Sequence, residues 1–217
     1  MNFTIPFACT ITASPGSGKT YLIKYLIHKL LLNQQINYVY VVTGTSFNNA
    51  YNFLPANNVI QVNDEKEFIK TLGSLMNKQI QTITQGRRLN QCLIVFDDVI
   101  GHVNWNKSIY STLMCNHRHY KVSLIWAPQY VKKIPPLFRG CTMYVFIFKL
   151  RSEIEIKAVC EAFLTELSST KQMKEYFENK FGNVVNYYCL FIDNINNKRM
   201  MFKAPRYQQL NFNFVNI

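Results

Sequence analysis

A glycine-rich stretch near the start of the chain, TASPGSGKT at residues 12–20, has the residue types and spacing that bind a polyphosphate. In such a loop the backbone N–H groups and the N-terminus of the next helix surround phosphate oxygens. Lys19 would reach the β- and γ-phosphates, and the Thr20 hydroxyl would bind Mg²⁺. The sequence therefore predicts a Walker A loop, whose phosphate-binding residues are Ser14, Pro15, Gly16, Ser17, Gly18, Lys19 and Thr20.

The loop departs from the motif at its first position, where Ala13 replaces the leading glycine. Alanine is a small change at that corner as long as its φ stays negative, because only positive φ values clash with a Cβ atom. We therefore expect the loop to keep its chemistry.

Two adjacent carboxylates could complete a hydrolytic site. The run LIVFDDV ends an apolar segment with Asp97 and Asp98, the only acids between residues 68 and 152. Burial of such a pair without a cation is costly. We predict that Asp97 binds the hydrated Mg²⁺ and that Asp98 orients or activates the attacking water. Many related ATPases carry the longer Glu at the second position, so Glu153 and Glu155 remain alternative bases.

The elements that must position these residues follow from the apolar pattern. Strands are expected at 7–13, 36–44, 92–99, 122–129 and 141–148, and helices at 19–32, 64–80 and 106–119. The strands are apolar throughout, which indicates a parallel sheet covered by helices on both faces. The sequence predicts an α/β, doubly wound fold of the P-loop NTPase type.

Beyond residue 150 the pattern changes to two helices, at 153–167 and 170–181, followed by two strands, at 186–193 and 198–204. We predict that residues 1–150 form the P-loop core. Residues 151–217 are expected to be an α+β extension that packs on the same domain, either as a lid or as an added edge of the sheet.

The size and apolar pattern of the chain limit its class. Its 217 residues suit one domain, and no apolar run reaches the ~20 residues of a membrane-spanning helix. The N-terminus lacks a basic leader and leads directly into the first predicted strand, so we expect an intracellular protein.

The net charge of +12 indicates a polyanionic partner. Residues 68–152 carry twelve Lys or Arg and only two acids. In this chain Arg87 and Arg88 fall in a polar loop, and Lys132 and Lys133 follow a predicted strand. The alternative for all four is an ordinary solvated face.

A set of residues after the second motif narrows the class of NTPase. The segment 116–148 contains Arg118-His119, then an apolar strand that ends at Gln129, then Pro135-Pro136 and Arg139. This order resembles that of the DNA-packaging ATPases of the FtsK/HerA superfamily, the poxvirus-type group of large DNA viruses and virophages. The resemblance covers about residues 7–150 and implies a RecA-like sheet of the ASCE type.

The resemblance implies roles for three of these residues. Gln129 would be a sensor that contacts the γ-phosphate or the lytic water. Arg118 and Arg139 are candidate arginine fingers that act on the nucleotide of an adjacent subunit, and Arg118 is slightly favoured. The alternatives are a polar strand end for Gln129, and a DNA phosphate contact or a solvated charge for either arginine.

The resemblance also implies a function. It predicts a ring of five or six subunits that uses ATP and Mg²⁺ to thread double-stranded DNA through a central pore into a preformed viral capsid. The candidate DNA contacts of that pore are Arg87, Arg88, Lys132 and Lys133. The expected partners are capsid, portal or internal-membrane proteins. The expected locations are viral assembly sites in the host-cell cytoplasm and the virion.

Other functions stay open from the residues alone. One is a DNA helicase or replication ATPase on a similar core. Another is a nucleotide kinase, which would need an acceptor pocket and an arginine-rich lid. The third is an assembly protein that binds nucleotide and DNA without hydrolysis.

Overall fold

The structure is a computed structural model that describes residues 2–44, 49–62, 65–87, 90–99, 101, 103–183, 187–212 and 214. In these residues one eight-stranded sheet has the order β3-β2-β4-β5-β1-β6-β7-β8. The strands are β1 (Ala8–Thr12), β2 (Tyr38–Thr43), β3 (Val59–Gln61), β4 (Cys92–Asp97), β5 (Val122–Ala127), β6 (Tyr144–Phe148), β7 (Tyr188–Asp193) and β8 (Lys198–Lys203).

The first six strands run parallel, and β7 and β8 are antiparallel to their neighbours. Strand β5 lies between β1 and β4, so the strand that leads into the phosphate loop is separated by one strand from the strand that ends in the two acids. The parallel strands all end at one side of the sheet, which we call the C-terminal edge. The predicted α/β class, with a doubly wound and mainly parallel sheet, is confirmed.

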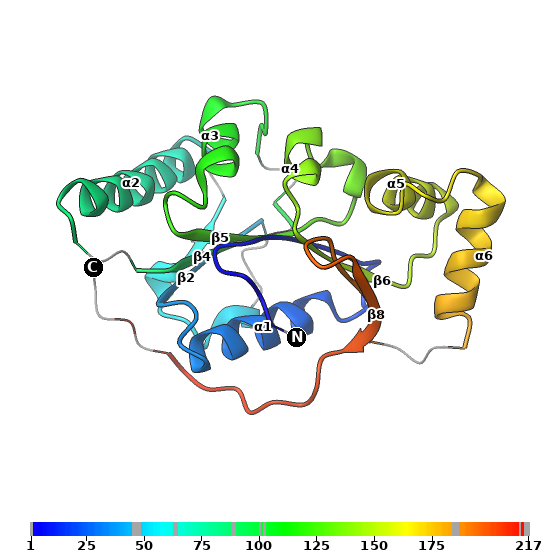
Figure 1. The fold of residues 1–217 in the computed structure, drawn as a ribbon. Helices are drawn as coiled ribbons and strands as arrows, with labels where there is room; N and C mark the ends of the chain where they lie inside the picture. The colour runs from blue at the N-terminus through cyan, green and yellow to red at the C-terminus, as the bar shows by residue number, and fades with distance from the viewer. Residues whose placement is uncertain are drawn as a thin grey trace.

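Helices cover both faces of the sheet (Figure 1). Helices α2, α3, α4 and α5 lie on one face, and α1 lies on the other. Their bounds are α1 (Lys19–Leu32), α2 (Glu65–Thr84), α3 (Ser108–Asn116), α4 (Pro136–Gly140), α5 (Glu153–Phe163) and α6 (Thr170–Phe181). Each face has its own core because the central strands β1, β4, β5 and β6 are buried on both sides.

Helix α1 is held against the sheet by its predicted apolar residues and, from outside, by the C-terminal segment. Leu22, Ile23 and Leu26 are buried in the core below β1. The segment after β8 crosses the outer side of α1 (Figure 1), where the Leu210 N–H donates to His28 Nε2 at 3.2 Å. The C-terminal segment therefore fixes the helix that begins at the phosphate loop.

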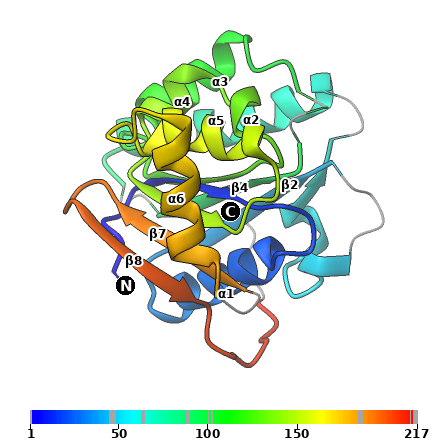
Figure 2. The same cartoon turned by 90° about the vertical axis from the view of Figure 1, so that its right-hand side faces the viewer.

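The last third of the chain widens the sheet. Strand β7 pairs with β6, and β8 pairs with β7 (Figure 2). Helices α5 and α6 pack on this part of the sheet through a third apolar cluster that includes Phe163 and Phe177. No helix among the described residues has the length and apolar character that a membrane span requires.

Some elements differ from the sequence prediction. The helix expected at 106–119 ends at Asn116, because the chain turns there and the Val122 N–H donates to the His117 carbonyl at 2.8 Å. Strand β3 and the short helix α4 were not predicted. Both are too short to show a clear apolar period.

Candidate active site

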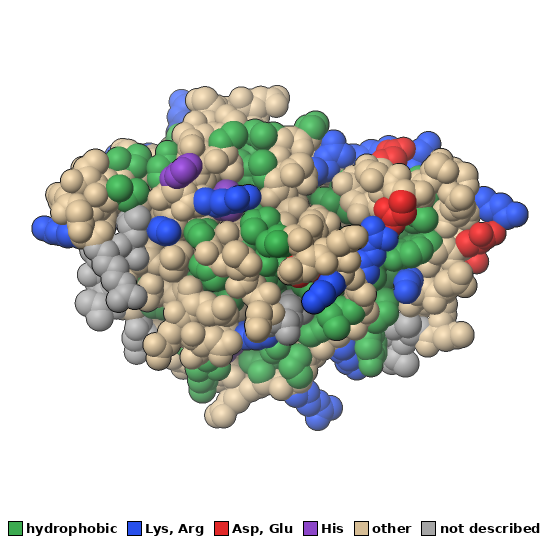
Figure 3. Space-filling model, viewed as in Figure 1, with side chains coloured by type: hydrophobic (Ala, Val, Ile, Leu, Met, Phe, Trp, Pro, Cys, Tyr) green, Lys and Arg blue, Asp and Glu red, His purple; other side chains and the backbone are tan. Residues whose placement is uncertain are grey.

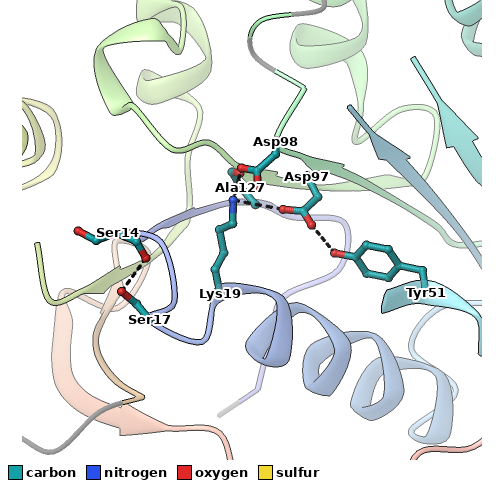
Figure 4. Close-up of polar contacts among 7 residues, drawn as sticks. All are labelled: Ser14, Ser17, Lys19, Tyr51, Asp97, Asp98 and Ala127. Carbon is teal, nitrogen blue, oxygen red and sulfur yellow. Dashed lines mark hydrogen bonds and ion pairs between the residues drawn. The ribbon is translucent and has the colours of Figure 1, made fainter. Parts of the chain in front are cut away.

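The glycine-rich loop joins the end of β1 to the start of α1, as predicted. Gly16 and Gly18 have φ values of +76° and +99°, which side chains with a Cβ rarely adopt. Among the described residues Ala13 is not one of those with a positive φ, so alanine fits that corner. The Ser17 hydroxyl donates to the Ser14 carbonyl at 2.7 Å and closes the turn (Figure 4).

The loop has the donors that a phosphate needs. Helix α1 begins at Lys19 without a side-chain cap and without an acid in its first turn. Its first N–H groups have no acceptor within the helix, and its N-terminus carries a partial positive charge. The Ser14 hydroxyl is buried and has no hydrogen-bond partner. These groups fit the anionic oxygens of a polyphosphate.

Lys19 points from α1 toward the ends of β4 and β5 (Figure 4). Its ammonium group is ion-paired with Asp98, donates to the Ala127 carbonyl at 3.0 Å, and lies 3.3 Å from Asp97 Oδ1. Only 11% of its side chain is exposed. The structure thus brings Lys19 and both acids together, although they lie almost eighty positions apart in the sequence.

Asp97 is a buried carboxylate at the last position of β4. The Tyr51 hydroxyl donates to Asp97 Oδ2 at 2.7 Å. Burial raises the pKa of the Asp97 carboxyl above its ordinary value, while Lys19 and the Tyr51 hydroxyl act in the opposite direction. Burial also raises the pKa of Tyr51 well above its ordinary value, so its hydroxyl stays a donor.

Asp98 is the next residue, just past the end of β4, and is half-buried. Its φ is +55°, in the left-handed region that Asp tolerates better than most residues. The Asp98 N–H contacts the Ala127 carbonyl at 3.4 Å. This backbone turn directs the Asp98 side chain to Lys19 at the C-terminal edge.

The oxygen atoms at this edge suit Mg²⁺. Asp97 Oδ1 is ion-paired with Lys19 but makes no hydrogen bond, and Thr20 is the second residue of α1, directly after Lys19. Among the described residues no three His, Cys, Asp or Glu side chains form a metal-binding group. Mg²⁺ commonly binds through one or two protein oxygens together with substrate phosphates and waters. The residues therefore fit an Mg²⁺ that arrives with a nucleotide.

Gln129 lies two residues after β5, the strand between β1 and β4. Its side chain is exposed and lines a hollow at the C-terminal edge with Thr12, Lys132 and Glu155. Glu153 instead pairs with Lys174 on α6 at 2.6 Å. Of the two alternative acids, Glu155 is thus the one that shares a hollow with Gln129 and with Thr12, the last residue of β1.

Both candidate arginine fingers lie at the opposite edge. Arg118 precedes β5 and Arg139 precedes β6, whereas the phosphate loop follows β1. A five-residue strand separates these edges by roughly 17 Å, since a strand rises about 3.3 Å per residue. Neither arginine lies near the chain's own phosphate loop. Arg118 is exposed, and Arg139 is half-buried with an unpartnered Nε.

The three candidate DNA contacts among the described residues do not form one patch. Lys132 and Lys133 are exposed at the C-terminal edge, after Gln129. Arg87 is exposed and follows the C-terminal end of α2. Near that end the Gln79 side chain donates to the carbonyls of Asn90 and Tyr120, which precede β4 and β5. Arg87 therefore lies toward the other edge. Arg88 lies outside the described residues.

One residue of the site was missed by the sequence analysis. Tyr51 lies in a short 3-10 turn after β2, and its contact with Asp97 joins segments 46 positions apart. No local motif surrounds it. The only available signal was a tyrosine that follows a buried strand next to the acid-bearing strand.

Comparison with known proteins shows which proteins the chain resembles. The family model described as Poxvirus A32 protein matches residues 3–180. A relative from Invertebrate iridescent virus 6, named uncharacterized protein 075L, is 27% identical over 189 residues, which are 85% of this chain and 69% of that protein.

Solved structures of other proteins also resemble the fold. The genome packaging NTPase B204 from Sulfolobus turreted icosahedral virus 2, bound to ATP-γ-S, has a TM-score of 0.67 and 18% identity over 94% of this chain and 99% of that one. The pCW3 conjugation coupling protein TcpA has a TM-score of 0.63 and 17% identity over 96% of this chain and 61% of that one.

Proposed function

Because the chain belongs to the poxvirus A32 protein family, we propose that it is an ATPase that moves double-stranded DNA into a viral capsid. The observation that carries this proposal is the cluster of Lys19, Asp97 and Asp98 at the edge where the phosphate loop lies. Gln129 follows β5 at the same edge. The match to a genome packaging NTPase supports the same reading at the level of fold.

The proposed hydrolysis assigns one task to each residue. Lys19 and the backbone of residues 14–20 bind the triphosphate, and Thr20 and Asp97 hold Mg²⁺. When bound, Mg²⁺ would neutralise charge on the phosphate oxygens. Asp98 orients the attacking water and accepts its proton, and Gln129 contacts the water or the γ-phosphate.

The proposed assembly is a ring, because both arginines lie far from the chain's own nucleotide site. In a head-to-tail ring the opposite edge of one subunit can reach the phosphate loop of the next. We assign Arg118 as the finger because it is exposed, whereas Arg139 is half-buried. An arginine supplied in this way is worth ~10³ or more in rate.

The proposed substrate is duplex DNA, held by its phosphates. The chain carries a net charge of +12. The acidic side chains visible in Figure 3 gather mainly over α5 and α6. A motor that moves along any sequence is served by phosphate contacts, which carry no sequence information. Lys132 and Lys133 are the proposed contacts at the C-terminal edge, and Arg87 is the proposed contact toward the other edge. Arg88, outside the described residues, stays a candidate from the sequence.

The proposed organisation and setting follow from this function. Residues 1–150 act as the ATPase core, and residues 151–217 extend its sheet and cover α1. The protein would work at viral assembly sites in the host cell. There it would dock on capsid, portal or internal-membrane proteins.

The test is ATP hydrolysis by the purified protein with and without linear duplex DNA, at low and at moderate salt. We expect strong stimulation by DNA that weakens as salt rises, and no turnover in a Lys19→Ala variant. Turnover that does not respond to DNA would contradict the motor. Phosphate transfer to a small acceptor would instead favour a kinase.

A further inference from the structure

The ring of Tyr187 lies directly against the phosphate loop. A Cβ atom added at Gly18 would lie 2.5 Å from Tyr187 Cδ1, so ring and loop are in contact. Two features therefore require glycine at position 18. Its φ of +99° strains a residue with a Cβ atom, and the Tyr187 ring occupies the space that a Cβ atom would need.

The topology explains why a residue so late in the chain reaches this loop. Strand β7 is antiparallel to β6, and Cys189 pairs with Phe148, the last residue of β6. The start of β7 is therefore at the C-terminal edge, where the phosphate loop lies. The φ of Tyr187 is +78°, which residues other than glycine rarely adopt. This backbone conformation belongs to the turn that presents the ring to the loop.

The Tyr187 ring is available to a ligand. Tyr187 is 53% exposed, although one side of its ring rests on Gly18. An exposed aromatic surface next to a phosphate loop is a platform on which a flat ring can stack.

The sheet order indicates which part of a nucleotide would meet this platform. Lys19 reaches toward β4 and β5 on one side of β1, which places the β- and γ-phosphates there. Tyr187 comes from β7, on the other side of β1. The rest of a bound nucleotide must leave the loop away from the γ-phosphate, and hence toward β6 and β7.

A second exposed aromatic residue, Tyr21, lies in the first turn of α1 next to the phosphate loop. Tyr21 follows Thr20 in α1 and is 40% exposed. Its hydroxyl donates to the Pro205 carbonyl at 3.0 Å, and Pro205 follows the end of β8, which pairs with the start of β7. The C-terminal segment thus borders the area between the first turn of α1 and Tyr187.

We propose that Tyr187 is the platform on which the base of the bound nucleotide stacks. This inference rests on the proposed nucleotide-binding function and adds the residue that holds the base. Stacking depends on the aromatic face and tolerates any base. Tyr187 therefore increases affinity for a nucleoside triphosphate over inorganic triphosphate, but it does not select adenine over guanine.

The test is calorimetric binding of Mg²⁺-ATP, Mg²⁺-GTP and inorganic tripolyphosphate. In the Tyr187→Ala variant we expect about tenfold weaker binding of both nucleotides, as for loss of one stacked base, and an unchanged Kd for tripolyphosphate. Tyr187→Phe keeps the ring and should bind like the unaltered protein. Tyr188→Ala removes a neighbouring tyrosine, whose ring lies 5.2 Å from the Lys203 ammonium, and is the matched control.

Each outcome either supports or overturns the role of Tyr187. Unchanged nucleotide binding in Tyr187→Ala, or an equal loss for tripolyphosphate, would overturn the base platform and leave the proposed function standing. If the unaltered protein bound neither nucleotides nor tripolyphosphate, the proposed function would fail and this inference with it. Lys19→Ala should weaken all three ligands, which separates loss of the phosphate site from loss of the base site.

Discussion

Lys19 of the phosphate loop is ion-paired with Asp98, the second of the two acids after β4 (Figure 4). The ammonium group thus contacts the carboxylate in the same region where it would contact a β- or γ-phosphate. Phosphate binding must therefore exchange one anionic partner of Lys19 for another. The exchange would release Asp98 for its proposed role toward water.

The first prediction concerns this exchange. Asp98→Asn removes the competing charge and keeps a side chain that tolerates the φ of +55°. We expect ATP to bind more tightly and turnover to fall by roughly 10²–10⁴, the usual contribution of a positioned acid or base. Equilibrium binding and single-turnover hydrolysis measure the two effects separately.

Glu155 provides the control, because it is the acid that lines the hollow with Gln129 and Thr12. Glu155→Gln should leave turnover within about twofold of the unaltered rate, since Asp98 supplies the general base. If Glu155→Gln lost activity and Asp98→Asn kept it, the two acids would have to exchange roles.

The second prediction uses the hydrogen bond from Tyr51 to Asp97. Tyr51→Phe removes the donor and leaves the ring in place, so the pKa of Asp97 should rise further. Asp97 must be ionised to hold Mg²⁺, so activity falls as pH drops through its pKa. The acid limb of the rate profile should therefore move to higher pH in the variant. An acid limb at the same pH in both proteins would show that the ionisation of Asp97 does not set it.

The same pKa direction predicts a change in stability. The folded-state pKa of Asp97 is raised above its unfolded value. Its contribution to stability is therefore present below the unfolded pKa and is lost as pH rises through the folded pKa. At neutral pH the charge destabilises the nucleotide-free protein. Asp97→Asn should keep or increase the free energy of unfolding while Mg²⁺-dependent hydrolysis is lost. A loss of more than ~1 kcal/mol, a typical hydrogen bond, would contradict this.

The third prediction tests whether Arg118 acts on a neighbouring subunit. Arg118→Ala and Lys19→Ala should each be inactive alone. When the two variants are mixed in equal amounts, about a quarter of the interfaces in the ring should combine an intact nucleotide site with an intact arginine. Hydrolysis should return at those interfaces. Arg139→Ala is the matched control, and its mixture with Lys19→Ala should gain nothing over Arg139→Ala alone. Recovery in the Arg139 mixture, and none in the Arg118 mixture, would assign the finger to Arg139.

The phosphate loop, the acid pair and the sheet class were predictable because their signals are local. The loop is one contiguous motif, and each buried strand is a contiguous apolar run. The resemblance to the poxvirus-type packaging ATPases also came from contiguous segments, and the family match over residues 3–180 confirms it.

The contacts of Tyr51 and Tyr187 could not be predicted, because each depends on pairing between distant strands. Tyr51 reaches Asp97 only because β2 pairs with β4. Tyr187 reaches Gly18 only because β7 adds antiparallel to β6. The placement of Arg118 and Arg139 at the edge opposite the loop likewise follows from strand direction. A single sequence does not encode these pairings in any local pattern.

The most direct measurement of the central claim is displacement of a third DNA strand from a duplex by the protein with Mg²⁺-ATP. A motor that moves along duplex DNA should displace the third strand without separating the duplex, and Lys19→Ala should not. A forked duplex in the same assay should stay paired. Strand separation at the fork without triplex displacement would contradict the duplex motor and support a helicase.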